Sequence, residues 1–456
     1  MTKPPVTSPA ILRRLDEVEQ ALLNRWPETR IAPTLERIAM LADLLGSPQL
    51  SYPTIHIAGT NGKTTTTRLI DALCHELGMR TGRFTSPHLE SFLERICING
   101  ESISAEGMIA TYDDIALYLD LVDSKMSHRL SFFEAMTALS FVAFAEFPVD
   151  VGIFECGMGG EWDSTNVINA DVSVMTPIGF DHMQYLGDTL TKIATTKSGI
   201  FKEGCFAVMA RQEQEAATIL MKKAAEMSAL PIREGIEYSV QNRSIAVGGQ
   251  SLDIQGVYGE YKEIFLPLHG EHQSSNAATA LAAVEVFAGE SNLDEEAVRQ
   301  AFAKATSPGR CEVVLRNPTV IIDAAHNPHG AISLRRTIET EFNFDAIVGV
   351  VAPMGDKDVD GILEEFEPFM NRVIVTRNTS HRAAPVDKLE NMAKEIFGAD
   401  RVEKVENLQI AIERAIDLAQ RLIESGDGTC GVVIAGSVVT AGEARAIARS
   451  MQGVNG

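Results

Sequence analysis

The hydrophobic positions of this chain follow two spacings that alternate along its length. Short apolar runs, such as Thr54–Ala58 and residues 149–154, have the length and composition of buried strands. Between such runs, residues 65–77 and 131–147 carry apolar side chains at the spacing of one helix face. Strands that alternate with helices predict an α/β protein whose parallel sheet is covered by helices on both faces.

The same pattern predicts most elements of the first two thirds of the chain. Residues 244–268 change to short alternating runs with glycines, which predict an inserted hairpin. A helix is expected again at 274–288. The other predicted strands lie at 80–84, 172–175 and 205–209, and the other predicted helices at 9–24, 34–46, 104–123 and 189–199.

A break in the pattern divides the chain into two predicted domains. Thr306-Ser307-Pro308-Gly309 has the composition of a linker. A fresh alternation follows it, with strands predicted at 319–323, 346–351, 372–376 and 431–435. We therefore expect a doubly wound domain over 1–307 and a smaller Rossmann-like α/β domain over 308–456.

Composition and charge narrow the class of protein. The 456 residues are 45% hydrophobic and 22% charged, which is ordinary for a globular protein, and the formal net charge is −22. Such an acidic chain is not expected to bind nucleic acid or an anionic membrane. The six cysteines form no C-x-x-C pair, the N-terminus has no signal-peptide pattern, and no apolar run reaches the about 18 residues of a membrane span. We expect a cytoplasmic, monomeric enzyme.

The most informative motif is a phosphate-binding loop between the strand at 54–58 and the helix that begins near Thr65. Gly59 and Gly62 let backbone N–H groups close on phosphate oxygens. Lys63 adds a positive charge, and the Thr64 hydroxyl is a ligand for Mg²⁺. The loop predicts a nucleotide triphosphate site, made by Gly59, Thr60, Asn61, Gly62, Lys63, Thr64 and Thr65. The first domain is accordingly expected to be a P-loop domain.

Other polar residues follow predicted strands of the first domain. Glu155 ends an apolar strand before Gly157-Met158-Gly159-Gly160, so its carboxylate is placed to hold Mg²⁺ directly or through water. Asp181-His182 follows the next strand, and His182 is either a ligand or a structural histidine. Lys197 lies near a helix end, where a cation also has the simpler role of interacting with the helix dipole.

Three residues of the second domain lie near strand ends, where ligands bind in open α/β sheets. They are His326, Lys357 and Ser437. A hydroxyl and an ammonium group suit a carboxylate, so Lys357 and Ser437 are candidates for binding a ligand that carries a carboxylate group. We include His326 in the same candidate site.

Short motifs along nearly the whole chain, taken in order, resemble the folylpolyglutamate synthase and dihydrofolate synthase family of the Mur ligase superfamily, and its actinobacterial members above all. Besides the P-loop, the motifs that carry the resemblance are Thr85-Ser86-Pro87-His88-Leu89, Glu94-Arg95-Ile96, Ser131-Phe132-Phe133-Glu134, Glu155-Cys156-Gly157-Met158-Gly159-Gly160, Asp163-Ser164-Thr165-Asn166, Asp181-His182, Lys197-Ser198-Gly199-Ile200, Ser275-Asn276-Ala277-Ala278-Thr279-Ala280-Leu281, Pro308-Gly309-Arg310, Asp323-Ala324-Ala325-His326-Asn327-Pro328, Asp356-Lys357-Asp358 and Gly436-Ser437.

The resemblance implies ATP as co-substrate and two Mg²⁺ ions. Ser86, Glu155 and Thr64 would hold the first ion, and His182 and Lys197 the second. An ammonium group has donors only, so the resemblance implies a Lys197 carbamylated by CO₂. Asn276 would contact adenine, Arg310 the γ-phosphate, and Asp323 the ribose or adenine. Lys63, Lys197, His182 and Arg310 would be the catalytic residues.

The resemblance also implies a folate pocket. Asp163, with its neighbours Trp162 and Ser164, would bind the pterin ring, and Phe132 and Phe133 would add ring contacts. Two positions depart from the family pattern, which often has an acidic residue at Ala32 and an arginine at Glu161. The full predicted pocket is Arg30, Ile31, Ala32, Ser131, Phe132, Phe133, Glu134, Trp162, Asp163 and Ser164.

The reaction implied is the ATP-dependent addition of L-glutamate to reduced folates, and also to dihydropteroate, through an acyl phosphate. Three alternatives stay open: an enzyme restricted to one of these acceptors, another amide ligase of the Mur superfamily, and a P-loop regulatory NTPase. Only 58 residues precede Gly59, which is short for the nucleotide-sugar domain of a cell-wall ligase. The second α/β domain argues against a regulatory NTPase.

Overall fold

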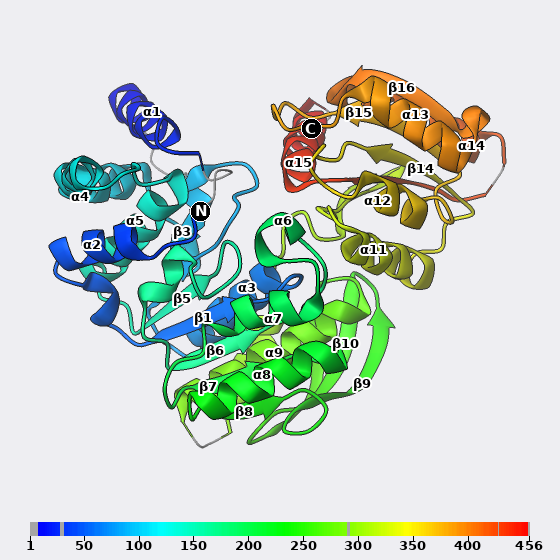
Figure 1. Ribbon diagram of the computed structural model, residues 1–456. Helices are drawn as coiled ribbons and strands as arrows, with labels where there is room; N and C mark the ends of the chain where they lie inside the picture. Colours follow the sequence, from blue (N-terminus) through cyan, green and yellow to red (C-terminus); the bar gives the residue numbers. More distant parts are fainter. Residues whose placement is uncertain (1–7, 28–31, 290–291, 427, 455–456) are drawn as a thin grey trace. The chain divides into compact units, whose positions relative to one another are not determined.

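The computed structural model describes residues 8–27, 32–289, 292–426 and 428–454. The chain forms two compact units (Figure 1). The first comprises Met1–Arg243, Ser251–Leu266 and Ser274–Ala305, and the second comprises Ser244–Gln250, Pro267–Gln273 and Thr306–Gly456. The division after residue 307 that the sequence suggests stays a prediction.

The larger sheet of the first unit has the strand order β4-β3-β2-β5-β1-β6-β7-β8. From β2 to β8 neighbouring strands pair in parallel, whereas β3 and β4 add an antiparallel edge. The strands are β1 (Thr54–Ala58), β2 (Thr81–Phe84), β3 (Ile96–Ile98), β4 (Glu101–Ser102), β5 (Val151–Glu155), β6 (Val172–Met175), β7 (Phe206–Met209) and β8 (Leu230–Arg233).

Helices cover this sheet because its central strands are apolar on both faces. Helix α3 contacts β1, β2 and β5, and α7 packs on α8. The helices of this part are α1 (Pro9–Leu23), α2 (Glu36–Leu44), α3 (Lys63–Glu76), α4 (Ala105–Lys125), α5 (Phe132–Glu146), α6 (Met183–Leu186), α7 (Leu190–Ser198), α8 (Gln214–Glu226) and α10 (Glu295–Ala303), with 3₁₀ turns η1 (Pro48–Leu50), η2 (Phe92–Arg95) and η3 (Ser164–Val167).

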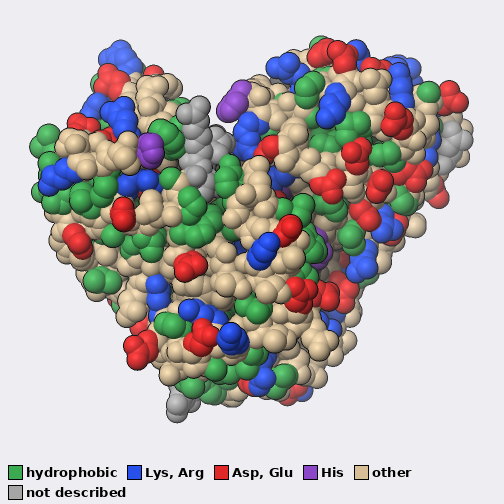
Figure 2. Space-filling view, in the orientation of Figure 1, with side chains coloured by type: hydrophobic (Ala, Val, Ile, Leu, Met, Phe, Trp, Pro, Cys, Tyr) green, Lys and Arg blue, Asp and Glu red, His purple; other side chains and the backbone are tan. Residues whose placement is uncertain are grey.

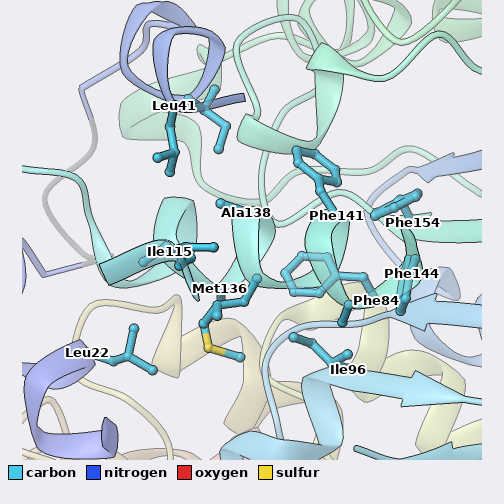
Figure 3. Close-up of a cluster of buried hydrophobic side chains, with 14 of the residues drawn as sticks. Leu22, Leu41, Phe84, Ile96, Ile115, Met136, Ala138, Phe141, Phe144 and Phe154 are labelled. Carbon is cyan, nitrogen blue, oxygen red and sulfur yellow. The ribbon is translucent and has the colours of Figure 1, made fainter. Parts of the chain in front are cut away.

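An aromatic cluster anchors α5 to the sheet (Figure 3). Phe84 of β2 and Phe154 of β5 are partners in the strand register and are both fully buried. The ring centroids of Phe141 and Phe144 lie 5.4 and 5.5 Å from that of Phe154. Edge-on and tilted aromatic pairs at such distances stabilise a core beyond their buried area. The cluster therefore fixes α5, whose N-terminus carries the predicted ring-binding residues.

The predicted hairpin at 244–268 is a three-stranded sheet of order β11-β10-β9. Its strands are β9 (Ser239–Ala246), β10 (Gly249–Gln255) and β11 (Glu260–Leu266), followed by α9 (Glu271–Ala288). Glu285 of α9 is fully buried, and its carboxylate accepts hydrogen bonds from the backbone N–H groups of Val257 and Gly259. This contact ties the turn after β10 to the helix.

The sheet of the second unit has the order β12-β13-β17-β14-β15-β16, parallel except for β12. Helices α11 to α13 share one core cluster with it, while α14 and α15 contact its strands separately. The elements are β12 (Glu312–Arg316), β13 (Thr319–Ile322), α11 (Pro328–Glu341), β14 (Ala346–Val351), α12 (Val359–Phe366), β15 (Arg372–Arg377), α13 (Val386–Phe397), η4 (Ala399–Arg401), β16 (Val402–Asn407), α14 (Leu408–Glu424), β17 (Cys430–Ala435) and α15 (Val438–Val454).

The α/β class with a parallel-sheet first part is confirmed, with two corrections. Both sheets are mixed at one edge, because β3, β4 and β12 pair antiparallel. The inserted segment has one strand more than a hairpin. Acidic and basic side chains are intermixed on the face drawn in Figure 2. Among the described residues, no helix is long and apolar enough to cross a membrane.

Candidate active site

Four groups of predicted site residues in the first unit follow four neighbouring strands, β2, β5, β1 and β6. These strands are parallel, so their carboxyl ends lie at one edge of the sheet. The segments that leave this edge are the P-loop, the Ser86 loop, the Glu155 loop and the segment that leads to His182. Four segments far apart in the sequence therefore meet where ligands bind in open α/β sheets.

The P-loop has the backbone that its glycines predict. Gly59 and Gly62 have φ values of +143° and +87°, which side-chain-bearing residues rarely adopt. A Cβ at Gly59 would lie 1.9 Å from Thr176 Oγ1. The N–H and hydroxyl of Thr60 bond to Pro177 O and Gly179 O, both at 3.0 Å, which fixes the loop against the segment after β6.

Lys63 lies at the first position of α3 and bends back over the loop. Its Nζ donates to the carbonyls of Gly59 and Thr60 at 3.2 and 3.1 Å. Asn276 of α9 reaches the same loop, since a Cβ at Gly62 would lie 2.5 Å from Asn276 Oδ1. The structure thus brings Asn276, the predicted adenine-binding residue, to the P-loop. The side chain of Thr65, the last predicted residue of this loop, is buried.

The predicted ligands of the first Mg²⁺ ion meet around Glu155. Its Oε1 accepts a 2.7 Å hydrogen bond from Thr64 Oγ1, and its Oε2 accepts a 3.3 Å hydrogen bond from Ser86 N. Glu155 is only 1% exposed. A buried carboxylate with two hydroxyl-bearing residues beside it provides the hard oxygen donors that Mg²⁺ prefers.

This donor set fits Mg²⁺ bound together with phosphate. In the described part of the chain, no group of three or more His, Cys, Asp or Glu side chains is arranged to hold a metal ion. Mg²⁺ commonly takes only one or two protein carboxylates and completes its octahedron with phosphate oxygens and water. One carboxylate beside the P-loop is therefore suitable for a metal that arrives with a nucleotide.

Lys197 is buried in the same place, at 5% exposure. Its Nζ donates a 2.7 Å hydrogen bond to Gly59 O. Burial and the charge of Lys63 lower the pKa of Lys197 to about 7, against the opposing effect of Asp181 and Asp163. An amine with this pKa is largely neutral just above pH 7, which a solvated lysine is not. The helix-dipole role alone does not explain a lysine buried against the P-loop.

His182 follows the anchored Gly179 and is the N-cap residue directly before α6, in a left-handed conformation with φ at 50°. Its backbone N–H donates to Asp181 Oδ1 at 2.8 Å, and its Nε2 lies 3.7 Å from Asp181 Oδ2. The negative charge of Asp181 also raises the pKa of Lys197, against the larger effect of burial. No role for Asp181 is predicted from the sequence, although the residue directly precedes His182.

The Gly157–Gly160 loop packs closely on two neighbours. A Cβ at Gly157 would lie 2.6 Å from the Phe133 ring, and one at Gly160 would lie 2.5 Å from Lys197 O. Neither position has room for a larger residue. The glycines therefore allow the loop after β5 to lie between the predicted ring-binding helix and the end of α7.

Asp163 is buried at 4% exposure and caps the turn η3. Its Oδ2 accepts from Met158 N at 2.8 Å, and its Oδ1 accepts from Thr165 N at 3.0 Å and Thr165 Oγ1 at 2.6 Å. Burial raises the pKa of Asp163, and these hydrogen bonds oppose the rise. Both oxygens already hold the loop together, and the predicted contact with a pterin ring stays a prediction.

The helix start Ser131–Glu134 forms a capping box, in which each side chain bonds to the backbone N–H of the other. Glu134 also accepts a 2.9 Å hydrogen bond from Arg37 Nε. Phe132 is 5% exposed, and its ring lies 4.8 Å from the guanidinium carbon of Arg95. These contacts hold the predicted ring-binding segment in place.

The remaining predicted pocket residues lie close to this segment or outside the described residues. Ser164 is buried, with its Oγ 3.4 Å from Thr137 Oγ1 on α5. Trp162 is half-buried and packs near Gly159. Ala32 O accepts a 3.4 Å hydrogen bond from Arg37 Nη2. Arg30 and Ile31 lie outside the described residues.

In the second unit, Asp323 follows β13 and is anchored by two backbone groups. It accepts hydrogen bonds from Cys311 N and Ala325 N, each at 2.7 Å. Burial raises the pKa of Asp323, while the charge of Arg310 acts in the opposite direction. His326 Nδ1 lies 2.9 Å from Ala324 O, so this nitrogen carries the proton. The structure brings Arg310, Asp323 and His326 together.

Lys357 and Ser437 differ in their surroundings. Lys357 lies half-buried in the loop between β14 and α12. Ser437 is 2% exposed, and its Oγ accepts from Thr440 N at 3.0 Å and from Asn378 Nδ2 at 3.2 Å. Ser437 thus caps α15, and glutamate binding by either residue stays a prediction.

In this site the P-loop residue Thr64 bonds to the buried Glu155, and the buried Lys197 lies beside the same loop. Two models of known protein families match the chain that carries this site. The Mur ligase middle domain matches residues 57–284, and the Mur ligase glutamate ligase domain matches residues 309–438. The fold and the site therefore define the class as a Mur ligase, an ATP-dependent amide-forming enzyme.

Curated relatives and solved structures narrow the class further. The chain is 49% identical to the dihydrofolate synthase/folylpolyglutamate synthase of Mycobacterium tuberculosis, over 97% of this chain and 95% of that protein. The structure of the M. tuberculosis folylpolyglutamate synthase complexed with ADP has a TM-score of 0.93 and 50% identity, over 96% of this chain and 99% of that one. A folylpolyglutamate synthase–AMPPCP–folate complex has a TM-score of 0.80 and 28% identity, over 94% and 98%. The chain belongs to the folylpolyglutamate synthase/dihydrofolate synthase family.

Proposed function

We propose that this enzyme adds L-glutamate to reduced folates and to dihydropteroate, with ATP as co-substrate. The observation that carries the proposal is the set of contacts that joins Thr64, Glu155 and Ser86 beside the P-loop. Relatives named for both activities support the two acceptors. The related complex with AMPPCP and folate supports a site that takes a nucleotide and a folate together.

In the proposed reaction, a carboxylate oxygen of the acceptor attacks the γ-phosphorus of ATP, and ADP leaves. The amine of L-glutamate then attacks the acyl carbon, phosphate leaves, and the nitrogen loses a proton to give the amide. The P-loop N–H groups and the Lys63 ammonium bind the phosphates and stabilise the charge that develops during transfer. Arg310 is proposed to do the same at the γ-phosphate.

Mg²⁺ would be held by Thr64, Ser86 and Glu155 and would neutralise phosphate charge. We further propose a second Mg²⁺ site that uses His182 and a carbamylated Lys197. Carbamate formation needs a neutral amine, and the lowered pKa of Lys197 supplies one near neutral pH. Incubation with ¹³C-bicarbonate should give a carbamate carbonyl resonance that is absent from Lys197→Ala, and its absence from the active wild type would contradict the modification.

The other assignments follow the same lines. We propose that Asn276 and Asp323 bind the nucleoside and that His326, Lys357 and Ser437 bind L-glutamate. The predicted pocket, made by residues 30–32, 131–134 and 162–164, would hold the pterin ring of the acceptor. We also propose domains over 1–307 and 308–456 and a monomer in the cytoplasm, where the six buried free thiols suit a reducing environment.

The proposal is tested by release of ADP from ATP with L-glutamate and either dihydropteroate or tetrahydrofolate. ADP should form only when acceptor and glutamate are both present, and the product should carry one more glutamyl residue. Activity with only one acceptor would restrict the proposal to a monofunctional enzyme. ADP release that ignores both substrates would contradict it.

A further inference from the structure

A short segment without regular secondary structure follows β6 and leads toward His182. It consists of residues 176–179, and both Thr176 and Ile178 are buried in it. Because the segment forms neither a strand nor a helix, its buried backbone groups need hydrogen-bond partners from elsewhere in the fold. These partners come from two sides, the P-loop and a glutamine in the loop after β7.

On one side, residues 176–179 hold the P-loop. The carbonyl oxygen of Pro177 accepts hydrogen bonds from Thr60 N at 3.0 Å and from Asn61 N at 3.4 Å. The Thr60 hydroxyl is paired with the backbone of Gly179, since it donates to Gly179 O and accepts from Gly179 N, both at 3.0 Å. The conformation of residues 176–179 therefore fixes Thr60 and Asn61, two residues of the predicted phosphate-binding loop.

On the other side, the side chain of Gln212 holds the same segment. Its Oε1 accepts a 3.0 Å hydrogen bond from Ile178 N, and its Nε2 donates to the carbonyl oxygens of Thr176 and Met175 at 3.1 and 3.4 Å. An N–H partner for the oxygen and carbonyl partners for the nitrogen determine the orientation of the amide. Gln212 thus bonds to the backbone on both sides of Pro177, whose carbonyl oxygen accepts from the P-loop.

The position of Gln212 follows from the sheet. β7 pairs with β6 in parallel, so the loop that begins after Met209 leaves the sheet at the same edge as residues 176–179. Gln212 is half-buried there. A single glutamine after a strand has no sequence pattern that would reveal these contacts. A loop that is held in place before its ligand arrives loses less conformational freedom when the ligand binds.

We propose that Gln212 is a positioning residue for the nucleotide, whose amide holds residues 176–179 in the conformation that keeps Thr60 and Asn61 in place for phosphate binding. This proposal rests on the proposed function, because it assumes that the P-loop binds the phosphates of ATP. Gln212 acts through residues 176–179 and makes no contact of its own with the reacting groups.

Gln212→Met removes the three hydrogen bonds and nearly preserves the volume of the side chain. ADP binding should be measured by isothermal titration calorimetry in the presence of Mg²⁺. The Kd should rise about tenfold, the factor that corresponds to one lost hydrogen bond. The KM for ATP should rise with it, whereas the KM for tetrahydrofolate should change little. Gln214→Met, at an exposed position at the start of α8, is the matched control and should bind ADP like the wild type.

A double-mutant cycle tests the route of this effect. Thr60→Val removes the hydroxyl that bonds to Gly179 and keeps a β-branched side chain. If Gln212 acts through residues 176–179, the loss of ADP affinity in the double variant should be smaller than the product of the two single losses. A loss equal to that product would contradict the proposed route.

Amide hydrogen exchange gives a second readout, independent of activity. The Ile178 N–H should exchange faster in Gln212→Met than in the wild type, because it loses its acceptor. An unchanged exchange rate would contradict the proposal. If Gln212→Met does not fold, Gln212→Glu replaces it, since glutamate keeps the acceptor for Ile178 N and loses the donor to Thr176 O. It should also weaken ADP binding, and wild-type affinity would overturn the proposal.

The outcomes separate this proposal from the proposed function. Wild-type ADP affinity in a folded Gln212→Met, even with a lowered melting temperature, would make Gln212 a structural residue only and would overturn the proposal. Weakened ADP binding by Lys63→Ala in the same experiment would leave the phosphate-binding role of the P-loop intact. A wild type that does not bind ADP would overturn both.

Discussion

Lys197 Nζ donates a 2.7 Å hydrogen bond to the carbonyl oxygen of Gly59, the first residue of the P-loop. A residue from the end of α7 is thereby joined to the turn after β1, across 138 positions of sequence. The lysine is buried at 5% exposure, beside the positive charge of Lys63. Burial of an ammonium group costs free energy, so the protonation of Lys197 should affect the stability of the folded protein. The same lysine has to be neutral for the proposed carbamate to form.

Lys197→Met should stabilise the protein at pH 7 and abolish ligation. The pKa of Lys197 is about 7 in the folded protein and near 10.5 when unfolded. Between these two pKa values Lys197 is protonated in the unfolded chain but neutral in the folded protein. The free energy of unfolding of the wild type therefore rises with pH, by up to about 1.4 kcal/mol per pH unit from this group. The stability advantage of Lys197→Met should therefore shrink from pH 7 to pH 10.

Urea unfolding of both proteins in CO₂-depleted buffer measures this difference. Other titrating groups cancel when the two curves are subtracted, and Lys222→Met, at an exposed lysine of α8, should show no such trend. A difference that stays constant with pH would mean that Lys197 is not held with a lowered pKa.

Lys63→Ala should lower kcat by about a hundredfold or more while the protein stays folded. Lys63 Nζ donates hydrogen bonds to two carbonyls of the loop, so the side chain contributes charge to the phosphate site rather than apolar packing. Steady-state ADP release, with circular dichroism as the check on folding, tests this. Lys222→Ala serves as the matched control. Near-normal ligation by a folded Lys63→Ala protein would contradict the proposal that Lys63 binds the phosphates of ATP.

Asp163→Ala should lower the free energy of unfolding by about 1–3 kcal/mol, because it leaves the N–H groups of Met158 and Thr165 without their acceptor. If Asp163 also binds the pterin, the variant should lose more kcat/KM with dihydropteroate than with tetrahydrofolate. Thermal melting and both kinetic measurements are needed together. Equal losses with the two acceptors would leave Asp163 as the residue that holds the Gly157–Gly160 loop.

Lys357→Ala should raise the KM for L-glutamate and leave the KM for ATP nearly unchanged. The lysine lies in the loop after β14, where an ammonium group suits a carboxylate. Lys388→Ala, at an exposed position of α13, is the control. A change confined to the KM for ATP would assign Lys357 to the nucleotide instead.

The P-loop and the strand-end residues of the first unit were predictable from sequence for a physical reason. Buried parallel strands are continuous apolar runs, and the residues that follow them must lie at one edge of the sheet. Predicted strands at 172–175 and 346–351 accordingly have the observed bounds of β6 and β14. Such runs locate Glu155 and His182 without knowledge of the tertiary structure.

The remaining features depend on contacts that no short-range pattern records. β3 and β4 are too short to have a clear period, and they form because β2 offers an open edge. The inward direction of Asp163 follows from its capping of η3, and the loop after β2 is held by the hydrogen bond from Arg95 to His88. Both are side-chain hydrogen bonds that form only in the folded chain.

The most direct test of the central claim is a ligation assay followed by mass spectrometry. The enzyme is incubated with ATP, Mg²⁺ and L-glutamate, and separately with tetrahydrofolate or dihydropteroate as acceptor. We predict an amide product that carries an added glutamyl residue, formed with one ADP for each amide, and lost in Lys63→Ala. ATP hydrolysis with no glutamylated product from either acceptor would contradict the assignment of this enzyme as a folate-glutamate ligase.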